Sequence, residues 1–410
     1  MRALVKDTPH NDSTWAQGVR LENREIPANL APDEVLLKVL AAGICGTDVG
    51  IYNSKKSIRD EMQKARAASV VIGHEFAGRI EKAGPEALTR LAEIINTHRV
   101  HDEDADRFVH GRLPRQVAGD PAFPEFLKTH YTVSAEMHIT CGWCYQCRIG
   151  ERHVCRNTII KGVHEDGAFA EFVKVPVSNL ILFKAGELPV SIIAFMDALG
   201  NAVHTVESAN LVGQPVLVLG CGVQGLMATA IAHRSGTSRV YVTDVSNEAR
   251  GITHQMLENK RFELARKFGA NDCFDLALPA ERERMRRTIL SETDGSGVGV
   301  AFEMSGSYNA YRDAFDLLRM GGTLVCLGIP DGEMKVDFAH DVIFKGLTIH
   351  GVIGRRLFET WETMRSMLKS GLAQVFLDSG FITAEFPLEK FDDAMALIGR
   401  GEAFKVILKP

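Results

Sequence analysis

Hydrophobic residues are arranged differently in the two halves of the chain. In the first half, short apolar runs at 35–40 and 70–72 end in glycines and polar residues, which predicts strands joined by turns. From residue 215 onward, apolar runs typical of buried strands alternate with stretches typical of helices, and these segments are 215–219, 226–232, 239–243, 299–306, 308–319 and 321–329. Such an alternation predicts an α/β domain with a parallel, doubly wound sheet.

The length of the chain indicates more than one folding unit. At 410 residues it exceeds what one ordinary hydrophobic core supports, so we expect two domains. We place the first domain at 1–195 and the second at 196–345. The last segment, 346–410, contains a helical stretch and a final apolar strand, and we expect it to return to the first domain.

Composition restricts the class of protein. Hydrophobic residues make up 45% and charged residues 24%, as in an ordinary globular protein, and the net charge is -5. The acidic balance argues against nucleic-acid binding. No apolar stretch is long enough to span a membrane, and Met1–Val5 does not resemble a signal peptide. Four of the cysteines are scattered singly, which is typical of reduced thiols in a cytoplasmic protein.

The other four cysteines lie close together in the segment 138–156. They follow the spacing C-x2-C-x2-C-x7-C and are Cys141, Cys144, Cys147 and Cys155. Two-residue gaps let a tight turn direct successive sulfurs to one point, which predicts a closed structural zinc site. The alternatives are a disulfide cluster, thiols without a common ligand, or an iron–sulfur site, which usually has a proline after its last cysteine.

A second candidate metal site is spread over the first half of the chain. Cys45 stands between two glycines, which suggests a bend where a thiolate can face a cavity. His74 and Glu75 follow the apolar run 70–72 and a glycine. Cysteine, histidine and a carboxylate suit a catalytic zinc ion, which keeps one position open for water or substrate. Taken singly, such a cysteine is more often part of a core and such a His-Glu pair more often lies on the surface.

A glycine-rich turn separates the apolar run 215–219 from the small-residue helix after it. The motif is G-x-G-x-x-G, and its candidate cofactor-binding residues are Gly220, Gly222, Gln224 and Gly225. Glycines let the turn approach a pyrophosphate, and the N–H groups at the helix start favour that anion, so we expect a dinucleotide site. The next strand ends at Asp244, whose carboxylate would bind the adenosine ribose and favour NAD over NADP. The alternative is an ordinary acidic residue at a strand end.

Three motifs together resemble the zinc-dependent medium-chain alcohol dehydrogenases. They are Gly-Ile-Cys-Gly-Thr-Asp at 43–48, Gly-His-Glu-Phe-Ala-Gly at 73–78 and the four-cysteine segment. Within that family the chain is most similar to the L-threonine 3-dehydrogenase branch, through 153–158, 197–205, 343–347 and 354–361. The resemblance implies a GroES-like, β-rich catalytic domain, a Rossmann cofactor domain, NAD, one catalytic and one structural zinc ion, and a homotetramer.

The resemblance also assigns roles to single residues of the catalytic domain. Cys45, His74 and Glu75 match the catalytic zinc ligands. Thr47 matches the hydroxyl that passes the substrate proton outward, and Asp197 matches an acidic residue near the zinc ion, as an outer or an exchangeable ligand. In the cofactor domain, the resemblance places the backbone of Leu327 to Ile329 and of Ile353 against the nicotinamide, and a basic residue, Arg250 or Arg261, near the adenine.

The chain departs from the family in three places. The family usually carries a histidine five residues after the catalytic cysteine, as the next member of the proton relay, where this chain has Gly50. Two insertions, at 85–130 and 249–259, have no counterpart. The first contains His98, His101 and His110 among acidic residues, and we expect a solvated surface insertion that covers the cleft or a subunit contact, with metal binding as the alternative.

We therefore expect an enzyme that oxidises a small secondary alcohol with NAD, and by resemblance L-threonine to 2-amino-3-oxobutanoate. Arg355 could pair with the substrate carboxylate, since a guanidinium suits bidentate recognition; an ordinary salt bridge at the surface or between subunits is the alternative. The first rival function is a polyol or sugar dehydrogenase of the same superfamily. The second is a zinc-stabilised NAD-binding sensor without turnover, against which the intact set of metal ligands argues.

Overall fold

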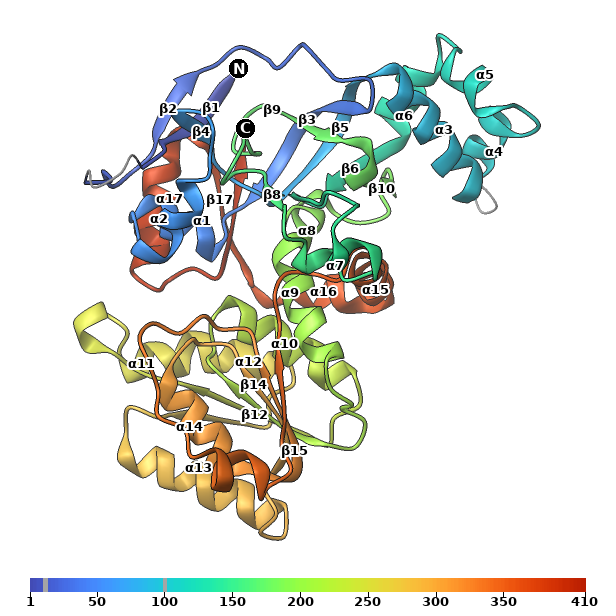
Figure 1. Cartoon of the computed structure of the whole chain (residues 1–410). Coiled ribbons are helices and arrows are strands. Elements are labelled where there is room, and N and C mark those ends of the chain that lie inside the picture. Colours follow the sequence, from blue (N-terminus) through green and yellow to red (C-terminus); the bar gives the residue numbers. More distant parts are fainter. Residues whose placement is uncertain (10–13, 99–101) are drawn as a thin grey trace. The chain divides into compact units, whose positions relative to one another are not determined.

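The computed structural model describes residues 1–9, 14–98 and 102–410, without the side chains of residues 98 and 250. The chain forms two units. The first comprises Met1–Asp197, Ala384–Met395 and Val406–Pro410, and the second comprises Ala198–Thr383 and Ala396–Lys405 (Figure 1). The return to the first unit is thus shorter than the predicted 346–410, because residues 346–383 stay in the second unit.

The first unit is rich in strands, as the predicted GroES-like domain requires. A three-stranded sheet has the order β2 (Arg20–Asn23), β1 (Arg2–Asp7), β4 (Ser69–Val71). A seven-stranded sheet has the order β10 (Leu180–Lys184), β6 (Tyr131–Ala135), β5 (Phe76–Ala83), β3 (Glu34–Gly43), β18 (Lys405–Lys409), β17 (Ile382–Pro387), with β9 (Phe172–Pro176) also paired to β3. A two-stranded sheet joins β7 (His138–Ile139) to β8 (Ile159–Ile160).

Short helices connect these strands. They are α1 (Gly46–Tyr52), α2 (Lys56–Met62), α3 (Pro85–His98), α4 (Glu103–Val109), α5 (Pro114–Ala118), α6 (Phe123–His130), α7 (Tyr145–Arg148), α8 (Val190–Ile193) and α17 (Phe391–Gly399). In the segment 167–176, regular strand structure begins only at Phe172, the first residue of β9.

The second unit contains the predicted doubly wound sheet. Its six strands have the order β13 (Asp272–Asp275), β12 (Arg239–Asp244), β11 (Pro215–Leu219), β14 (Val298–Glu303), β15 (Leu318–Cys326), β16 (Thr348–Gly351). All neighbouring pairs are parallel, and the order 3-2-1-4-5-6 is that of a Rossmann fold. The fold class predicted from the sequence is confirmed.

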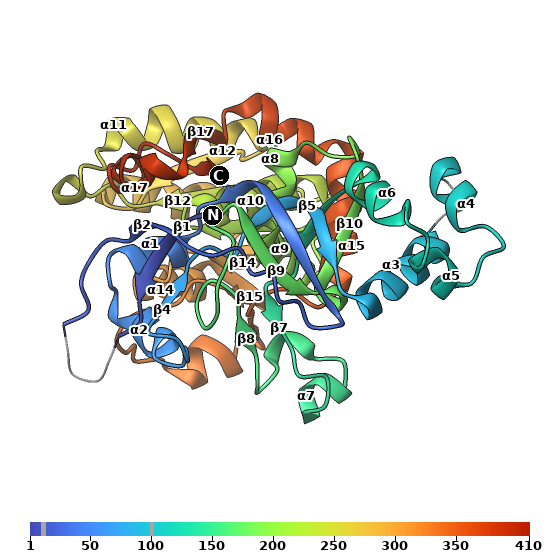
Figure 2. The ribbon, with the colours of Figure 1, turned by 90° about the horizontal axis from the view of Figure 1, so that it is seen from above.

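The remaining helices are α9 (Met196–Glu207), α10 (Val223–Arg234), α11 (His254–Met256), α12 (Glu263–Lys267), α13 (Pro279–Glu292), α14 (Tyr308–Leu317), α15 (Glu359–Met367) and α16 (Ala373–Ser379). Helices α10, α12, α13 and α14 pack against the six-stranded sheet (Figures 1 and 2). Strand β16 explains why the domain return begins later than predicted. Its residues pair with β15 yet are exposed, so the segment lacks the apolar pattern of a buried strand.

The insertion at 85–130 is a group of four helices, α3 to α6, that projects from strands β5 and β6 (Figures 1 and 2). It has a small core in which Phe108 stacks on Phe126 at 4.7 Å and Phe126 on His130 at 4.7 Å. The expectation of a merely solvated insertion was therefore too simple. Exposed His110 lies beside Asp106, whereas His101 and the side chain of His98 lie outside the described residues.

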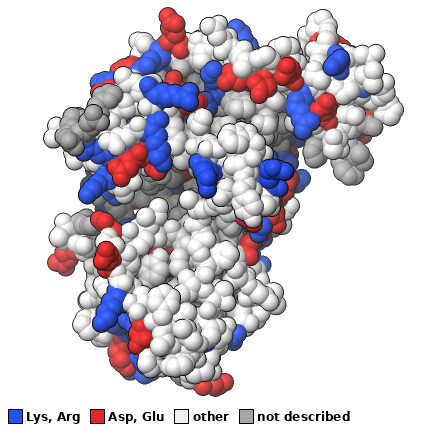
Figure 3. Space-filling model, in the orientation of Figure 1, with Lys and Arg blue, Asp and Glu red and all other residues white. Residues whose placement is uncertain are grey.

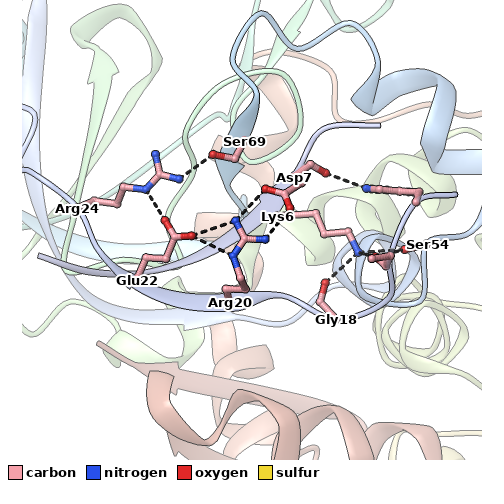
Figure 4. A network of polar contacts seen from close by, with 10 residues as sticks. Lys6, Asp7, Gly18, Arg20, Glu22, Arg24, Ser54 and Ser69 are labelled. Carbon is pink, nitrogen blue, oxygen red and sulfur yellow. Dashed lines mark hydrogen bonds and ion pairs between the residues drawn. The ribbon is translucent and has the colours of Figure 1, made fainter. Parts of the chain in front are cut away.

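A polar network anchors the N-terminal strand of the first unit (Figure 4). Buried Lys6 donates to the carbonyls of Ala16 and Gly18 and to the Ser54 hydroxyl, at 2.6, 2.9 and 3.0 Å. Nearby, Arg20 forms a bidentate pair with Asp7. The buried ammonium is thus fully hydrogen-bonded, and it ties strand β1 to the segment after it.

The molecular surface mixes both signs of charge. Figure 3 shows acidic and basic side chains interspersed over the first unit and few charged side chains over most of the second unit on this face. Among the described residues, no helix combines the length and the apolar character needed to cross a bilayer.

Candidate metal centre and dinucleotide site

The first unit gathers Cys45, His74 and Glu75. One donor atom from each of them lies within 4.8 Å of the other two. Zinc ligands bound at about 2.0–2.3 Å must lie within roughly 4.6 Å of one another, so the three donors need to move very little to share an ion. His74 and Glu75 are buried, and Cys45 is the residue that precedes helix α1.

Close backbone packing positions His74 and Glu75. The N–H of Ala168 donates to the carbonyl of Gly73 at 2.8 Å, and that of Gly43 donates to the carbonyl of Glu75 at 3.0 Å. A Cβ on Gly167 would lie 2.1 Å from the oxygen of Gly73, which leaves no room for a side chain. The peptide that carries the two ligands is therefore held from both sides.

Asp48 is a further candidate residue of this centre, which the sequence motifs did not single out. Its Oδ2 accepts the N–H of Cys45 at 2.9 Å, and its Oδ1 lies 3.6 Å from Nδ1 of His74. It thus links two of the three donors and orients them, as the outer carboxylates of metal sites do. The spacing Cys-x-x-Asp at the start of a helix is a capping signal that could have identified it.

The charge of this cluster suits a cation. Burial by itself lowers the pKa of His74, but the negative charges of Asp48 and Cys45, and that of Asp197, raise it well above its ordinary value. The structure therefore brings Asp197 near the donor set, as predicted. A divalent ion would neutralise this excess of negative charge, and thiolate, imidazole and carboxylate are ligands that zinc accepts.

Asp197 also meets two residues that no sequence motif indicated. Donor atoms of Glu136, His138 and Asp197 lie within 4.8 Å of one another, and Nδ1 of His138 is 2.8 Å from Oε1 of Glu136. Glu136 is fully buried, whereas the His138 side chain is 27% exposed. The three form a polar path from the metal centre to the surface of the unit.

The other predicted residues of this centre lie on helix α1. Thr47 is partly buried, two residues after Cys45. Gly50 is buried, and a Cβ there would meet Ile58 at 3.7 Å and Lys55 at 3.9 Å, which are ordinary contacts. Packing therefore does not require a glycine at position 50. The absence of the relay histidine changes the chemistry available for proton transfer and is not a consequence of limited space.

The four clustered cysteines converge as the spacing predicts. Sγ of Cys155 lies 3.6 Å from Sγ of Cys141 and 3.8 Å from Sγ of Cys144, far beyond the length of a disulfide bond, which is about 2.05 Å. Despite partial burial, hydrogen bonds from Asn157 and from backbone N–H groups lower the pKa of Cys141 to about 6. Burial and the neighbouring sulfurs raise the pKa of Cys147 to about 12. Four sulfurs within 4.8 Å of one another, without a disulfide bond, fit a closed site for zinc, which binds cysteine thiolates.

In the second unit, the glycine-rich turn has the conformation a dinucleotide needs. Gly220 has a φ of +108°, and a Cβ on Gly225 would lie 1.8 Å from the oxygen of Gly220. Exposed Gly222 precedes helix α10, and a Cβ there would meet open space, so a phosphate can approach its backbone. Gln224 instead turns its amide to the carbonyl of Ala198 at 3.1 Å.

An ion pair lies at the end of β12, where the sequence predicts that the adenosine ribose binds. Oδ2 of Asp244 lies 2.6 Å from Nη1 of Arg261, and its Oδ1 accepts the N–H of Val245. The insertion at 249–259 loops out and returns the chain so that Arg261 reaches the acid. Arg261 therefore lies beside Asp244, whereas the side chain of Arg250 lies outside the described residues, and a contact of either residue with an adenine stays a prediction.

The segments expected at the nicotinamide follow β15 and β16. Leu327 is partly buried, and the side chains of Ile329 and Ile353 are 88% and 62% exposed. Arg355 is only 2% exposed and donates to Oδ1 of Asn201 at 3.3 Å, so its side chain is buried within the second unit rather than on the surface. Its binding of a substrate carboxylate stays a prediction.

Comparisons with known proteins show the family of the chain. Residues 31–94 match the family described as alcohol dehydrogenase GroES-like domain, and residues 224–370 match the zinc-binding dehydrogenase family. The chain is 36% identical to L-threonine 3-dehydrogenase of Caldanaerobacter subterraneus subsp. tengcongensis, over 96% of both chains. It is 35% identical to L-threonine 3-dehydrogenase of Bacillus licheniformis, over 100% of this chain and 99% of that one. An alcohol dehydrogenase structure from Thermotoga maritima has a similar fold, with a TM-score of 0.76, 23% identity and coverage of 100% of this chain and 99% of the other.

Proposed function

Because the chain belongs to the zinc-dependent medium-chain alcohol dehydrogenases, we propose that it oxidises L-threonine at its secondary alcohol and uses NAD as the cofactor. The buried cluster of Cys45, His74 and Glu75 carries the proposed class of reaction. Identity of 36% to an L-threonine 3-dehydrogenase, over 96% of both chains, supports the substrate.

Each group in the proposed centre has one task. Cys45, His74 and Glu75 would hold a catalytic zinc ion, with Asp197 as an outer or exchangeable ligand. When bound, zinc supplies a Lewis acid for an alcohol oxygen and nicotinamide supplies a hydride acceptor. Thr47 would receive the alcohol proton, two residues from Cys45 on the first turn of α1. Since Gly50 replaces the relay histidine, the proton would then leave through water or another side chain.

Other residues would stabilise the fold and select the cofactor. Cys141, Cys144, Cys147 and Cys155 would hold a second, structural zinc ion. Asp244 favours NAD, because a carboxylate at the end of β12 would repel a 2′-phosphate. None of the eight cysteines, all of which lie in the described part of the chain, forms a disulfide bond, which suits a cytoplasmic enzyme.

We also propose that the protein forms a homo-oligomer, a tetramer by family resemblance. Strand β16 ends the six-stranded sheet, and its residues are exposed, so its outer edge can pair with a second copy. Large exposed hydrophobic side chains near it support this: Met320, Phe338, Ile343, Phe344 and Ile349.

A spectrophotometric screen tests the function. Purified protein is given NAD or NADP with L-threonine, other amino alcohols and a set of polyols, and NADH formation is followed with and without a zinc chelator. We expect chelator-sensitive turnover of L-threonine with NAD. Good turnover of a polyol without turnover of L-threonine would show that the substrate is a polyol. NADH binding without any turnover would favour a sensor.

A further inference from the structure

Three neighbouring strands of the second sheet end around one buried carboxylate, that of Glu303. It is the last residue of β14, which lies between β11 and β15, and its side chain is fully buried. The chain leaves these three strands in turns at 220–222, 304–307 and 327–329, each containing glycine. A buried charge is costly unless it is hydrogen-bonded, so the partners of Glu303 indicate its role.

Its side chain fixes the turn after its own strand. Oε1 accepts the N–H of Ser305 at 2.9 Å, the N–H of Gly306 at 3.0 Å and also the Ser305 hydroxyl. Oε2 lies 3.2 Å from the same N–H of Gly306. Hydrogen bonds to a carboxylate are stronger than neutral ones, so this turn has little freedom.

Glu303 also fixes the turn after β15. Its backbone carbonyl accepts the N–H groups of Leu327 and Gly328, each at 3.0 Å. A Cβ on Gly328 would lie 2.5 Å from Oε2 of Glu303 and 2.2 Å from the nitrogen of Gly306. The two turns are thus stacked directly on each other, with Glu303 between them.

The glycine-rich turn is packed against the same layer. A Cβ on Gly220 would lie 2.9 Å from Cβ of Ser305, and the N–H of Met304 donates to the carbonyl of Leu219 at 2.9 Å. Ligands of open α/β sheets bind at the carboxyl ends of the strands, where these turns lie. The shape of this edge therefore depends on a residue beneath it.

We propose that Glu303 is a positioning residue for the nicotinamide end of the cofactor, and this rests on the proposed dinucleotide function. It acts through the backbone of Leu327 to Ile329 rather than by touching the cofactor. The turn carries the 88% exposed side chain of Ile329, which gives a planar ring an apolar surface. Loss of the carboxylate would remove the hydrogen bonds that hold Ser305 and Gly306, so the turn at 304–307 would no longer give the turn at 327–329 a fixed surface to pack against.

Glu303→Gln tests the role, because it removes the charge and turns one acceptor into a donor that faces the N–H of Gly306. Binding of NADH and of ADP-ribose, which lacks nicotinamide, is measured by calorimetry on the full chain. We expect NADH to bind about tenfold more weakly, equivalent to about 1.4 kcal/mol, and ADP-ribose to stay within about twofold. Glu292→Gln is the matched control, since its carboxylate accepts the Tyr241 hydroxyl in the same unit, and it should bind both as wild type does.

If Glu303→Gln binds NADH as tightly as wild type does, the proposed role is wrong. It is also wrong if the variant loses NADH and ADP-ribose binding equally, because an equal loss indicates a general loss of structure. If Glu303→Gln does not fold, Ser305→Ala is the second variant, because it removes only the hydroxyl donor to Glu303. The other hydrogen bonds of Glu303 persist, so NADH binding should weaken only about threefold. Unchanged NADH binding in Ser305→Ala would overturn the role too. A wild-type protein that binds no NADH would instead remove the cofactor premise.

Discussion

Replacing Gly167 by alanine tests whether the packing behind His74 holds the metal ligands in place. The added Cβ would lie 2.1 Å from the carbonyl oxygen of Gly73 and 2.5 Å from Cα of Gly162. Both are backbone atoms, so rotation of a side chain cannot relieve the contact. Overpacking a buried site costs about 1–3 kcal/mol, and contacts this short place the variant at the upper end of that range.

We expect Gly167→Ala to lower the free energy of unfolding by about 3 kcal/mol, which lowers Tm by roughly 6–12 °C in a domain of 150–250 residues. It should also bind zinc at least about tenfold more weakly, because the displaced Gly73 precedes His74. Calorimetry and competition with a chelator measure the two effects. Gly399→Ala is the control, since a Cβ there meets nothing within 4 Å. Wild-type Tm and zinc affinity in Gly167→Ala would refute the reasoning.

Three further predictions follow from other contacts. Asp48→Asn should weaken zinc binding about 10–100-fold in chelator competition, because Asp48 orients Cys45 and His74; unchanged affinity would exclude that role. Asp244→Ala should raise the kcat/KM ratio of NADP to NAD at least about tenfold, since Arg261 would then face a 2′-phosphate, and an unaltered ratio would count against the adenosine site. Burial lowers the pKa of Lys6 from 10.5 to about 8, so the unfolded chain binds more protons between these values and stability rises with pH there. In denaturant melts from pH 7.5 to 10, wild type should gain about 1–3 kcal/mol over Lys6→Met, whereas parallel pH curves would contradict this.

The parts of the fold that the sequence predicted are those set by local patterns. The clustered cysteines and the glycine-rich turn each lie within one short segment, so spacing alone brings their atoms together. The parallel sheet followed from apolar runs that are buried on both faces. Exposed β16 has no such pattern, and its place in the sheet depends on pairing with β15, which is why the domain return was placed too early.

The residues of the candidate site were predictable only where they belong to a short sequence motif. Cys45, His74 and Glu75 were identified first as a ligand set beside glycines and an apolar run, and then by the family resemblance. The meeting of Glu136 and His138 with Asp197 joins segments about sixty residues apart in the sequence and has no local signal. The choice between Arg250 and Arg261 depended on how the insertion at 249–259 loops out, which periodicity does not reveal. Glu303 was noted only as part of a strand, because its role arises from three turns that meet in space.

Metal analysis of the purified chain tests the central claim most directly. We predict two zinc ions per chain in wild type, one in Cys45→Ser and one in Cys147→Ser, because each variant removes a donor from a different site. Two ions retained in Cys45→Ser, or a single ion in wild type, would contradict the assignment of Cys45, His74 and Glu75 as a metal centre.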